Sequence, residues 1–254
     1  MNIKNIINEF LKKFGYFDNK EIEGIIFYGS YQTNTNTQNS DVDLIIVYRD
    51  GSKKEAIKGY KRFKKKNFEY FERTLQSLYD RVDYDYDNFE DTLLSVVGYG
   101  EILIDNNSNL EKLKKYVINK YKYGLPKLSE KDKIYNIKGL QKSMDYLKKM
   151  NINNNPYFKI YYSLVLDKIR IFYNKLGGFS NMSSSKIYKL YTDEKMKIVQ
   201  HKFMPEEQFI KLYVECIQNI KYENIQNLYT YSIRDISKEI DFDNIRLSLG
   251  NRQH

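Results

Sequence analysis

Hydrophobic residues near the start of the chain follow two different patterns. Over residues 2–14 they recur every three or four positions, which is the spacing of a helix with one apolar face. Residues 22–28 and 41–48 are instead short, nearly continuous apolar runs bounded by polar residues, a pattern that favours buried strands. The sequence therefore predicts an amphipathic helix followed by two strands, with a polar loop between the strands.

Strand and helix patterns continue to alternate up to about residue 105. Residues 52–66 place Ala56, Ile57, Tyr60 and Phe63 on one side of a lysine-rich helix, so we expect a basic helix there. A run of this kind is usually a solvated face, and contact with nucleic acid is the alternative interpretation. Four further elements are then expected: a strand over residues 67–72, helices over 75–82 and 88–98, and a short strand at 102–104.

From about residue 109 onward the pattern is almost entirely helical. Leu125-Pro126 ends one helix, and Ser129 followed by Asp132 has the character of a helix N-cap with an acidic first turn. We therefore place a domain boundary here. The predicted fold class is α+β, with a small mixed sheet and flanking helices over residues 1–125 and an all-helical domain over residues 126–254.

Composition limits the classes of function only weakly. The formal net charge of +9 favours anionic partners, although a general bias toward Lys, Asn and Ile explains much of it. Cys216 is the only cysteine, so no internal disulfide forms, and Cys and His do not occur with the spacing of zinc ligands. The first residues carry no secretion signal and no apolar run approaches the length of a membrane span, so we expect a soluble, cytoplasmic protein.

The segment between the first two predicted strands carries the candidate chemistry. Gly29-Ser30 ends the first strand, ten residues follow, and Asp41-Val42-Asp43 begins the second strand. Residues two apart in a strand point to the same side, so Asp41 and Asp43 are predicted to share a face. Paired carboxylates suit Mg²⁺, which takes a few carboxylates together with phosphate oxygens and water. A glycine followed by a serine lets backbone N–H groups and a hydroxyl approach a triphosphate.

This spacing resembles the signature of the nucleotidyltransferase superfamily of DNA polymerase beta, and in particular the small antibiotic-modifying nucleotidyltransferases with a helical C-terminal domain. Gly29, Ser30, Asp41 and Asp43 carry the signature, and Ser40 matches the serine often found before the first aspartate. The chain departs from many relatives at Tyr31, where an arginine is common, and at Asn34, where a glycine is common. Asn tolerates the left-handed conformation that such a glycine adopts.

The resemblance also implies a third acidic residue on a later strand. Glu69, in the strand predicted over residues 67–72, is our preferred third ligand beside Asp41 and Asp43, which gives a predicted two-ion Mg²⁺ site. The alternating acids Asp83, Asp85 and Asp87 are the other candidates. Lys168 and Lys186 in the helical half are candidate contacts to the triphosphate, since related helical domains supply such cations.

Three hypotheses about function follow. The first is transfer of a nucleoside monophosphate, AMP from ATP, to a hydroxyl of a small molecule such as an aminoglycoside or lincosamide antibiotic, with release of pyrophosphate. The second places the transfer on tRNA or on a protein side chain, as in relatives from toxin–antitoxin systems. The third is a non-catalytic nucleotide-binding or RNA-binding module, which would have no need of the paired ligands Asp41 and Asp43.

Overall fold

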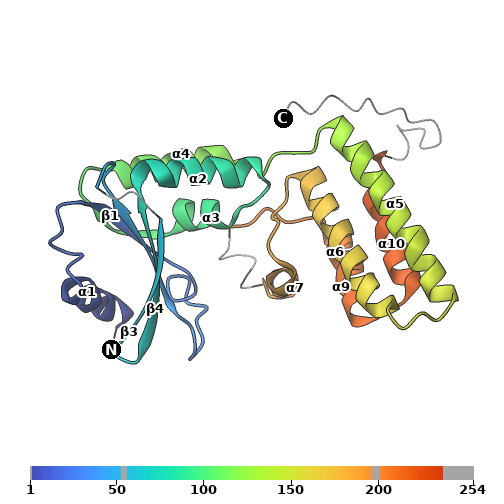
Figure 1. The fold of residues 1–254 in the computed structure, drawn as a ribbon, viewed down its shortest axis with the longest axis horizontal. Helices are drawn as coiled ribbons and strands as arrows, with labels where there is room; N and C mark the ends of the chain where they lie inside the picture. The colour runs from blue at the N-terminus through green and yellow to red at the C-terminus, as the bar shows by residue number, and fades with distance from the viewer. Residues whose placement is uncertain (1, 53–55, 195, 197–200, 237–254) are drawn as a thin grey trace. The chain divides into compact units, whose positions relative to one another are not determined.

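The computed structural model describes residues 2–52, 56–194, 196 and 201–236. Within it the chain divides into two compact units. Unit 1 comprises Met1–Leu125 together with Asp193–Lys202, and unit 2 comprises Pro126–Thr192 together with Phe203–His254. Strands and helices combine in unit 1 while unit 2 is helical, so the predicted α+β class is confirmed (Figure 1).

Unit 1 contains a mixed sheet of five strands in the order β3-β4-β2-β1-β5. The parallel pair, β2 with β4, lies at its centre, and the other neighbouring pairs are antiparallel. The strands are β1 (Ile22–Tyr28), β2 (Val42–Tyr48), β3 (Ile57–Phe63), β4 (Lys66–Thr74) and β5 (Glu101–Asp105). The sequence predicted all of these strands except β3.

Helices cover both faces of the sheet (Figure 1). Helix α1 (Ile3–Lys13) lies on one face, and its N-terminus is capped by the side chain of Asn2, which accepts a hydrogen bond from the N–H of Lys4 at 3.0 Å. Three helices pack on the other face: α2 (Leu75–Asp87), α3 (Thr92–Tyr99) and α4 (Asn109–Tyr121). This arrangement leaves each strand with one side chain facing α1 and the next facing α2 to α4.

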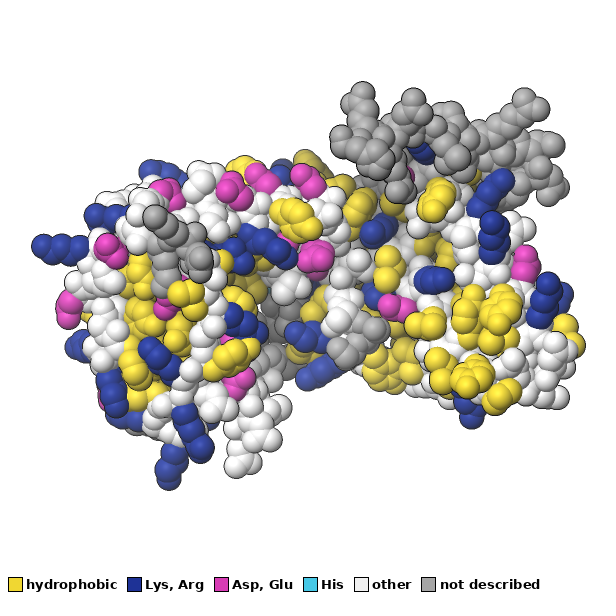
Figure 2. All heavy atoms as spheres, in the orientation of Figure 1, with side chains coloured by type: hydrophobic (Ala, Val, Ile, Leu, Met, Phe, Trp, Pro, Cys, Tyr) yellow, Lys and Arg dark blue, Asp and Glu magenta, His cyan; other side chains and the backbone are white. Residues whose placement is uncertain are grey.

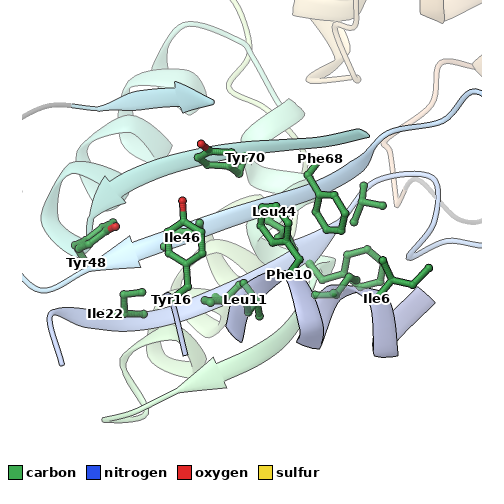
Figure 3. Close-up of a cluster of buried hydrophobic side chains, with 14 residues drawn as sticks. Ile6, Phe10, Leu11, Tyr16, Ile22, Leu44, Ile46, Tyr48, Phe68 and Tyr70 are labelled. Atoms are coloured by element: carbon green, nitrogen blue, oxygen red, sulfur yellow. The ribbon is translucent and has the colours of Figure 1, made fainter. Parts of the chain in front are cut away.

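The core between α1 and the sheet is aromatic (Figure 3). The rings of Phe10 in α1 and Phe68 in β4 stack with their centroids 4.0 Å apart, and Tyr16 and Tyr70 lie beside them. Val42 and Leu44 of β2 are fully buried in the same cluster. Because alternate residues of β2 and β4 are fixed in this core, the residues between them must point to the opposite face.

The helix predicted over residues 52–66 is wrong, since residues 57–63 form strand β3 at the edge of the sheet. Gly59 lies against the ring of Tyr70, and Phe63 packs near Phe10, so alternate residues of β3 face the α1 core. The apolar residues that suggested a helical repeat, Tyr60 and Phe63, therefore point to opposite faces. Pairing with β4 along the whole strand overrides the local pattern.

Unit 2 is built from helices α5 (Glu130–Ile152), α6 (Phe158–Gly177), α7 (Ser184–Thr192), α9 (Glu207–Gln218) and α10 (Tyr222–Ile233). Its core contains Leu147, Ile169, Phe209 and Leu228, all fully buried. Figure 2 shows apolar side chains gathered on one face of this unit. The exposed apolar residues of α6 include Ile160 and Leu164. No described helix in either unit is long and apolar enough to cross a membrane.

A buried ion pair joins Lys202 to Asp91 within unit 1. Lys202 Nζ lies 3.0 Å from Asp91 Oδ2, and the two side chains are 1% and 0% exposed. The hydroxyl of Tyr121 in α4 also donates to Asp91 Oδ2 at 2.7 Å. Removing one partner of a buried pair leaves an uncompensated charge. This contact therefore holds Lys202 in unit 1.

We predict that Asp91→Ala lowers the free energy of unfolding by about 3–5 kcal/mol, because it leaves the Lys202 ammonium buried without its carboxylate. Urea unfolding followed by circular dichroism measures the change. Asp87→Ala, which removes an exposed carboxylate nearby, is the matched control and is expected to change stability by less than about 0.5 kcal/mol. Equal midpoints for the two variants would contradict the assigned role of the pair.

Candidate active site

The loop after β1 begins with a glycine that the structure requires. Gly29 has a φ of +80°, and a Cβ at this position would lie 2.0 Å from Oδ2 of Asp43. The backbone N–H and hydroxyl of Thr33 both donate to the carbonyl of Gly29, at 3.1 and 3.2 Å, and Asn34 has a φ of 56°. The left-handed conformation expected for Asn34 is thus confirmed, and the loop turns tightly beside the Asp43 carboxylate.

Four polar side chains form a row across the sheet at this point. The strand register places Tyr28 of β1 opposite Asp43 of β2, Asp43 beside Glu69 of β4, and Glu69 opposite Tyr60 of β3. Residues paired across strands share a face. Because Val42 and Leu44 are buried against α1 on the other side, the whole row projects from the face opposite the aromatic core.

The phenol of Tyr28 lies close to both acids, and this proximity affects its pKa. Burial raises it well above its usual range, and the negative charges of Asp43 and then Glu69 raise it further. Both carboxylates are therefore close enough to the Tyr28 phenol to disfavour its anion. The phenol stays protonated at neutral pH and can only donate or accept a hydrogen bond, so it contributes no further negative charge to the row.

Asp41 and Ser40 lie immediately before β2. Asp41 is half-buried and stands two residues before Asp43, at the entry of the strand. The Ser40 hydroxyl accepts a hydrogen bond from the N–H of Thr37 at 2.8 Å, which closes the end of the polar loop. The hydroxyl of Ser30 has no hydrogen-bond partner among the described residues, so it is available to a ligand.

Lys58 is a site residue that the sequence analysis did not single out. Its Nζ lies 2.7 Å from Oε1 of Glu69, and hydrogen bonds to Glu69 and Tyr60 raise its pKa above the usual value. The ammonium is therefore charged and partly neutralises the acidic row. Polar and apolar residues do not alternate regularly in β3, and the spacing of its apolar residues was interpreted as a helical repeat.

Two of the three alternative acids pair with cations in the structure, and the third, Asp87, is the last residue of α2. Asp83 lies in α2 and contacts Lys120 of α4 at 2.8 Å, while Asp85 pairs with Arg81 of its own helix at 2.7 Å. Neither residue lies in a strand beside Asp43. The parallel register supports Glu69 in preference to them, and its role as a ligand stays a prediction.

The sequence of this chain matches a known protein family. The sequence model of the nucleotidyltransferase domain family matches residues 3–156, which is more than half of the chain. The chain belongs to this family. The match includes every strand of unit 1 and continues past Leu125 into unit 2. The protein is therefore a nucleotidyltransferase, and the resemblance inferred from Gly29, Ser30, Asp41 and Asp43 is confirmed.

Other comparisons are less informative. A solved structure of a nucleotidyltransferase-like protein from Exiguobacterium sibiricum is 16% identical, with a TM-score of 0.42, over 94% of this chain and 81% of the other. No curated protein matches the chain.

The donor atoms of this nucleotidyltransferase suit Mg²⁺. Among the described residues, no three side chains of His, Cys, Asp or Glu converge closely enough to hold a metal ion by themselves. Mg²⁺ does not need such a cage, since one or two carboxylates together with substrate phosphates complete its octahedron. Asp43, which lies against Gly29 and beside Glu69, and Asp41 at the strand entry both carry hard oxygen atoms of that kind, and their roles as ligands stay predictions.

The two predicted lysines of the helical half lie in unit 2. Lys168 is in α6, where its Nζ donates to the hydroxyl of Ser143 in α5 at 3.4 Å, and Lys186 is exposed on α7. Their contacts to a triphosphate stay predictions. His201 stacks on the ring of Tyr99 in unit 1, with ring centroids 3.9 Å apart.

We predict that Gly29→Ala destabilises the protein more than Gly15→Ala does. Both glycines have positive φ, 80° and 71°, so both substitutions cost about 1–2 kcal/mol in backbone strain. Nothing lies within 4 Å of a Cβ at Gly15, whereas a Cβ at Gly29 collides with the Asp43 carboxylate. Forced repacking adds about 1–3 kcal/mol to the second variant. Urea unfolding compares the two, and equal losses would contradict the close packing.

Proposed function

We propose that this nucleotidyltransferase transfers a nucleoside monophosphate, AMP from ATP, to a hydroxyl group of its acceptor and releases pyrophosphate. The observation that carries the proposal is the packing of the Asp43 carboxylate against Gly29, in register with Glu69. This packing joins the loop suited to a triphosphate to the carboxylates suited to a metal. The same residues supply both halves of a nucleotidyl-transfer site.

Asp41 and Asp43 would hold Mg²⁺, with Glu69 as the third ligand of a two-ion site. When bound, Mg²⁺ neutralises phosphate charge and favours the ionised form of the attacking hydroxyl. In the reaction the acceptor oxygen bonds to the α-phosphorus and the bond to the bridging oxygen breaks. The hydroxyl proton passes to a carboxylate of the acidic row, and pyrophosphate leaves.

Residues of this chain position the donor. The Ser30 hydroxyl and the tight turn after Gly29 bind the triphosphate, with Ser40 at the other side of the polar loop. Lys168 and Lys186 add cationic contacts from unit 2. Lys58, now paired with Glu69 at 2.7 Å, balances the negative charge of the row before a metal binds. Mg²⁺ and Lys58 would therefore share Glu69 as a partner.

The acceptor decides between the hypotheses drawn from the sequence. A small hydroxyl compound such as a lincosamide is the expectation from the resemblance. An aminoglycoside is a polycation, and the side chains nearest the acidic row on β3 and its turn are themselves cationic. Like charges at close range are unfavourable, so these surroundings favour the nucleic-acid form of the second hypothesis, in which tRNA is the acceptor.

We predict that Asp43→Asn lowers the rate of pyrophosphate release at least about 100-fold, because the variant loses the charge that holds the metal. The assay supplies ATP, GTP, CTP or UTP with Mg²⁺ and a panel of acceptors: an aminoglycoside, a lincosamide, tRNA and a short RNA. Chelation of the metal should abolish turnover. Asp18→Asn, an exposed acid in the loop between α1 and β1, is the matched control and should retain full activity.

The third ligand is tested in the same assay. Glu69→Gln is expected to abolish metal-dependent turnover, whereas Asp83→Asn should leave it intact. Full activity of Glu69→Gln would reject its assignment as a ligand. Retention of activity by Asp43→Asn, or turnover that is unaffected by chelation, would reject the proposed function as a whole.

A further inference from the structure

A polar pocket opens beside the acidic row of unit 1. Its volume is about 350 Å³, and it lies between the end of the polar loop and the turn of the β3–β4 hairpin. The lining contains three cations and no acidic side chain; its members are Gln38, Asn39, Ser40, Arg62, Lys65, Lys66 and Asn67. Ser40 adjoins the predicted ligand Asp41, and Asn67 is two residues from Glu69. The pocket is therefore next to the candidate active site.

The hairpin turn places lysine where lysine is conformationally disfavoured. Phe63 pairs with Lys66, so Lys64 and Lys65 form a two-residue loop, and their φ values are 46° and 63°. Two successive residues with positive φ are the pattern of a type I′ turn, for which Asn-Gly is the preferred pair. Lysine at both positions is strained, and such strain often marks a functional position.

The cations of this hairpin differ in their partners. Lys64 pairs with Glu9 of α1, and Lys66 donates to the hydroxyl of Tyr31, the residue that follows Ser30. Arg62 and Lys65 are exposed, and within residues 2–52, 56–194, 196 and 201–236 neither has an acidic partner. These two charges are thus uncompensated at a concave surface, which attracts an anion.

An exposed aromatic ring continues this surface toward the acidic row. Tyr60 lies in the edge strand β3, is 64% exposed, and stands opposite Glu69. Arg62 is two residues further along and therefore shares its face. Figure 2 shows Lys and Arg side chains over the part of unit 1 where Figure 1 draws β3 and β4. A ring between cations is the arrangement that binds single-stranded nucleic acid, with bases stacked and phosphates paired.

We propose that the edge of β3 and the hairpin turn bind single-stranded RNA as the acceptor, with Arg62 and Lys65 contacting phosphates and Tyr60 stacking on a base. The proposal rests on the proposed function for the reaction that follows, since the RNA hydroxyl would be presented to the acidic row. Binding itself requires neither nucleotide nor metal. The competing explanation is that lysine and arginine only protect an edge strand from pairing with other chains.

Fluorescence anisotropy of a labelled oligouridylate, without NTP or metal, tests the binding. Arg62→Gln/Lys65→Gln is expected to weaken affinity about 10-fold and to reduce the salt dependence of log K by about 1.4, because two phosphate contacts are lost from a single strand. The control Lys148→Gln/Lys149→Gln removes two exposed charges from α5 of unit 2 and should change neither value. Equal losses in both variants would overturn the proposal.

Single variants at two positions separate the stacking and turn contributions. Tyr60→Ala should weaken binding at least about 5-fold while Tyr60→Phe retains it, since stacking needs the ring and not the hydroxyl. Lys65→Gly should raise the urea midpoint, because glycine relieves the positive φ, and yet weaken RNA binding. A stabilised Lys65→Gly that binds RNA with unchanged affinity would overturn the role of Lys65.

Further arms distinguish other ligands and roles. Inorganic tripolyphosphate that binds and depends on Arg62 and Lys65, with no oligonucleotide binding, would identify a nucleotide phosphate site and overturn the RNA proposal. Self-association of Arg62→Gln/Lys65→Gln in size-exclusion chromatography, with RNA binding unchanged, would identify edge protection instead. Asp43→Asn is expected to bind RNA normally, so loss of transfer and loss of binding are measured separately.

Discussion

The close approach of Gly29 to the carboxylate of Asp43 is the constraint on which the candidate active site depends. Only a residue without a Cβ allows the first loop to turn directly over the second strand. The parallel pairing of β2 with β4 then fixes Glu69 beside Asp43, because the aromatic core on the α1 side determines which residues of each strand are free to face the site. Packing on the α1 face of the sheet thus positions the carboxylates on the opposite face.

Much of this arrangement could be predicted from local pattern. The motif residues Gly29, Ser30, Asp41 and Asp43 are close in sequence, and strand alternation predicts their faces. The resemblance to nucleotidyltransferases implied a third acid on a later strand, for which Glu69 was the best match. The alternation could not predict that β4 would pair with β2 in parallel and in register, since pairing is set by contacts between distant parts of the chain.

Strand β3 shows where local pattern fails. Tyr60 and Phe63 are spaced as they would be on a helix, and the intervening lysines suit either structure. Pairing with β4 decides that this segment is a strand, and it places Lys58 in an ion pair with Glu69. The same pairing brings Arg62 and Lys65 to the pocket beside Ser40. Tertiary structure therefore brings cations and carboxylates together on one surface. Composition alone indicated only a net positive charge.

The buried pair of Asp91 and Lys202 makes unit 1 discontinuous in the sequence. During synthesis the sheet and its helices, complete by Tyr121, emerge well before Lys202 does. Until that lysine arrives, Asp91 lacks its cation, and its carboxylate must stay solvated or protonated. Unit 1 therefore cannot reach its final packing as an early, separate step. The order of synthesis ties completion of the catalytic unit to the production of most of the helical unit.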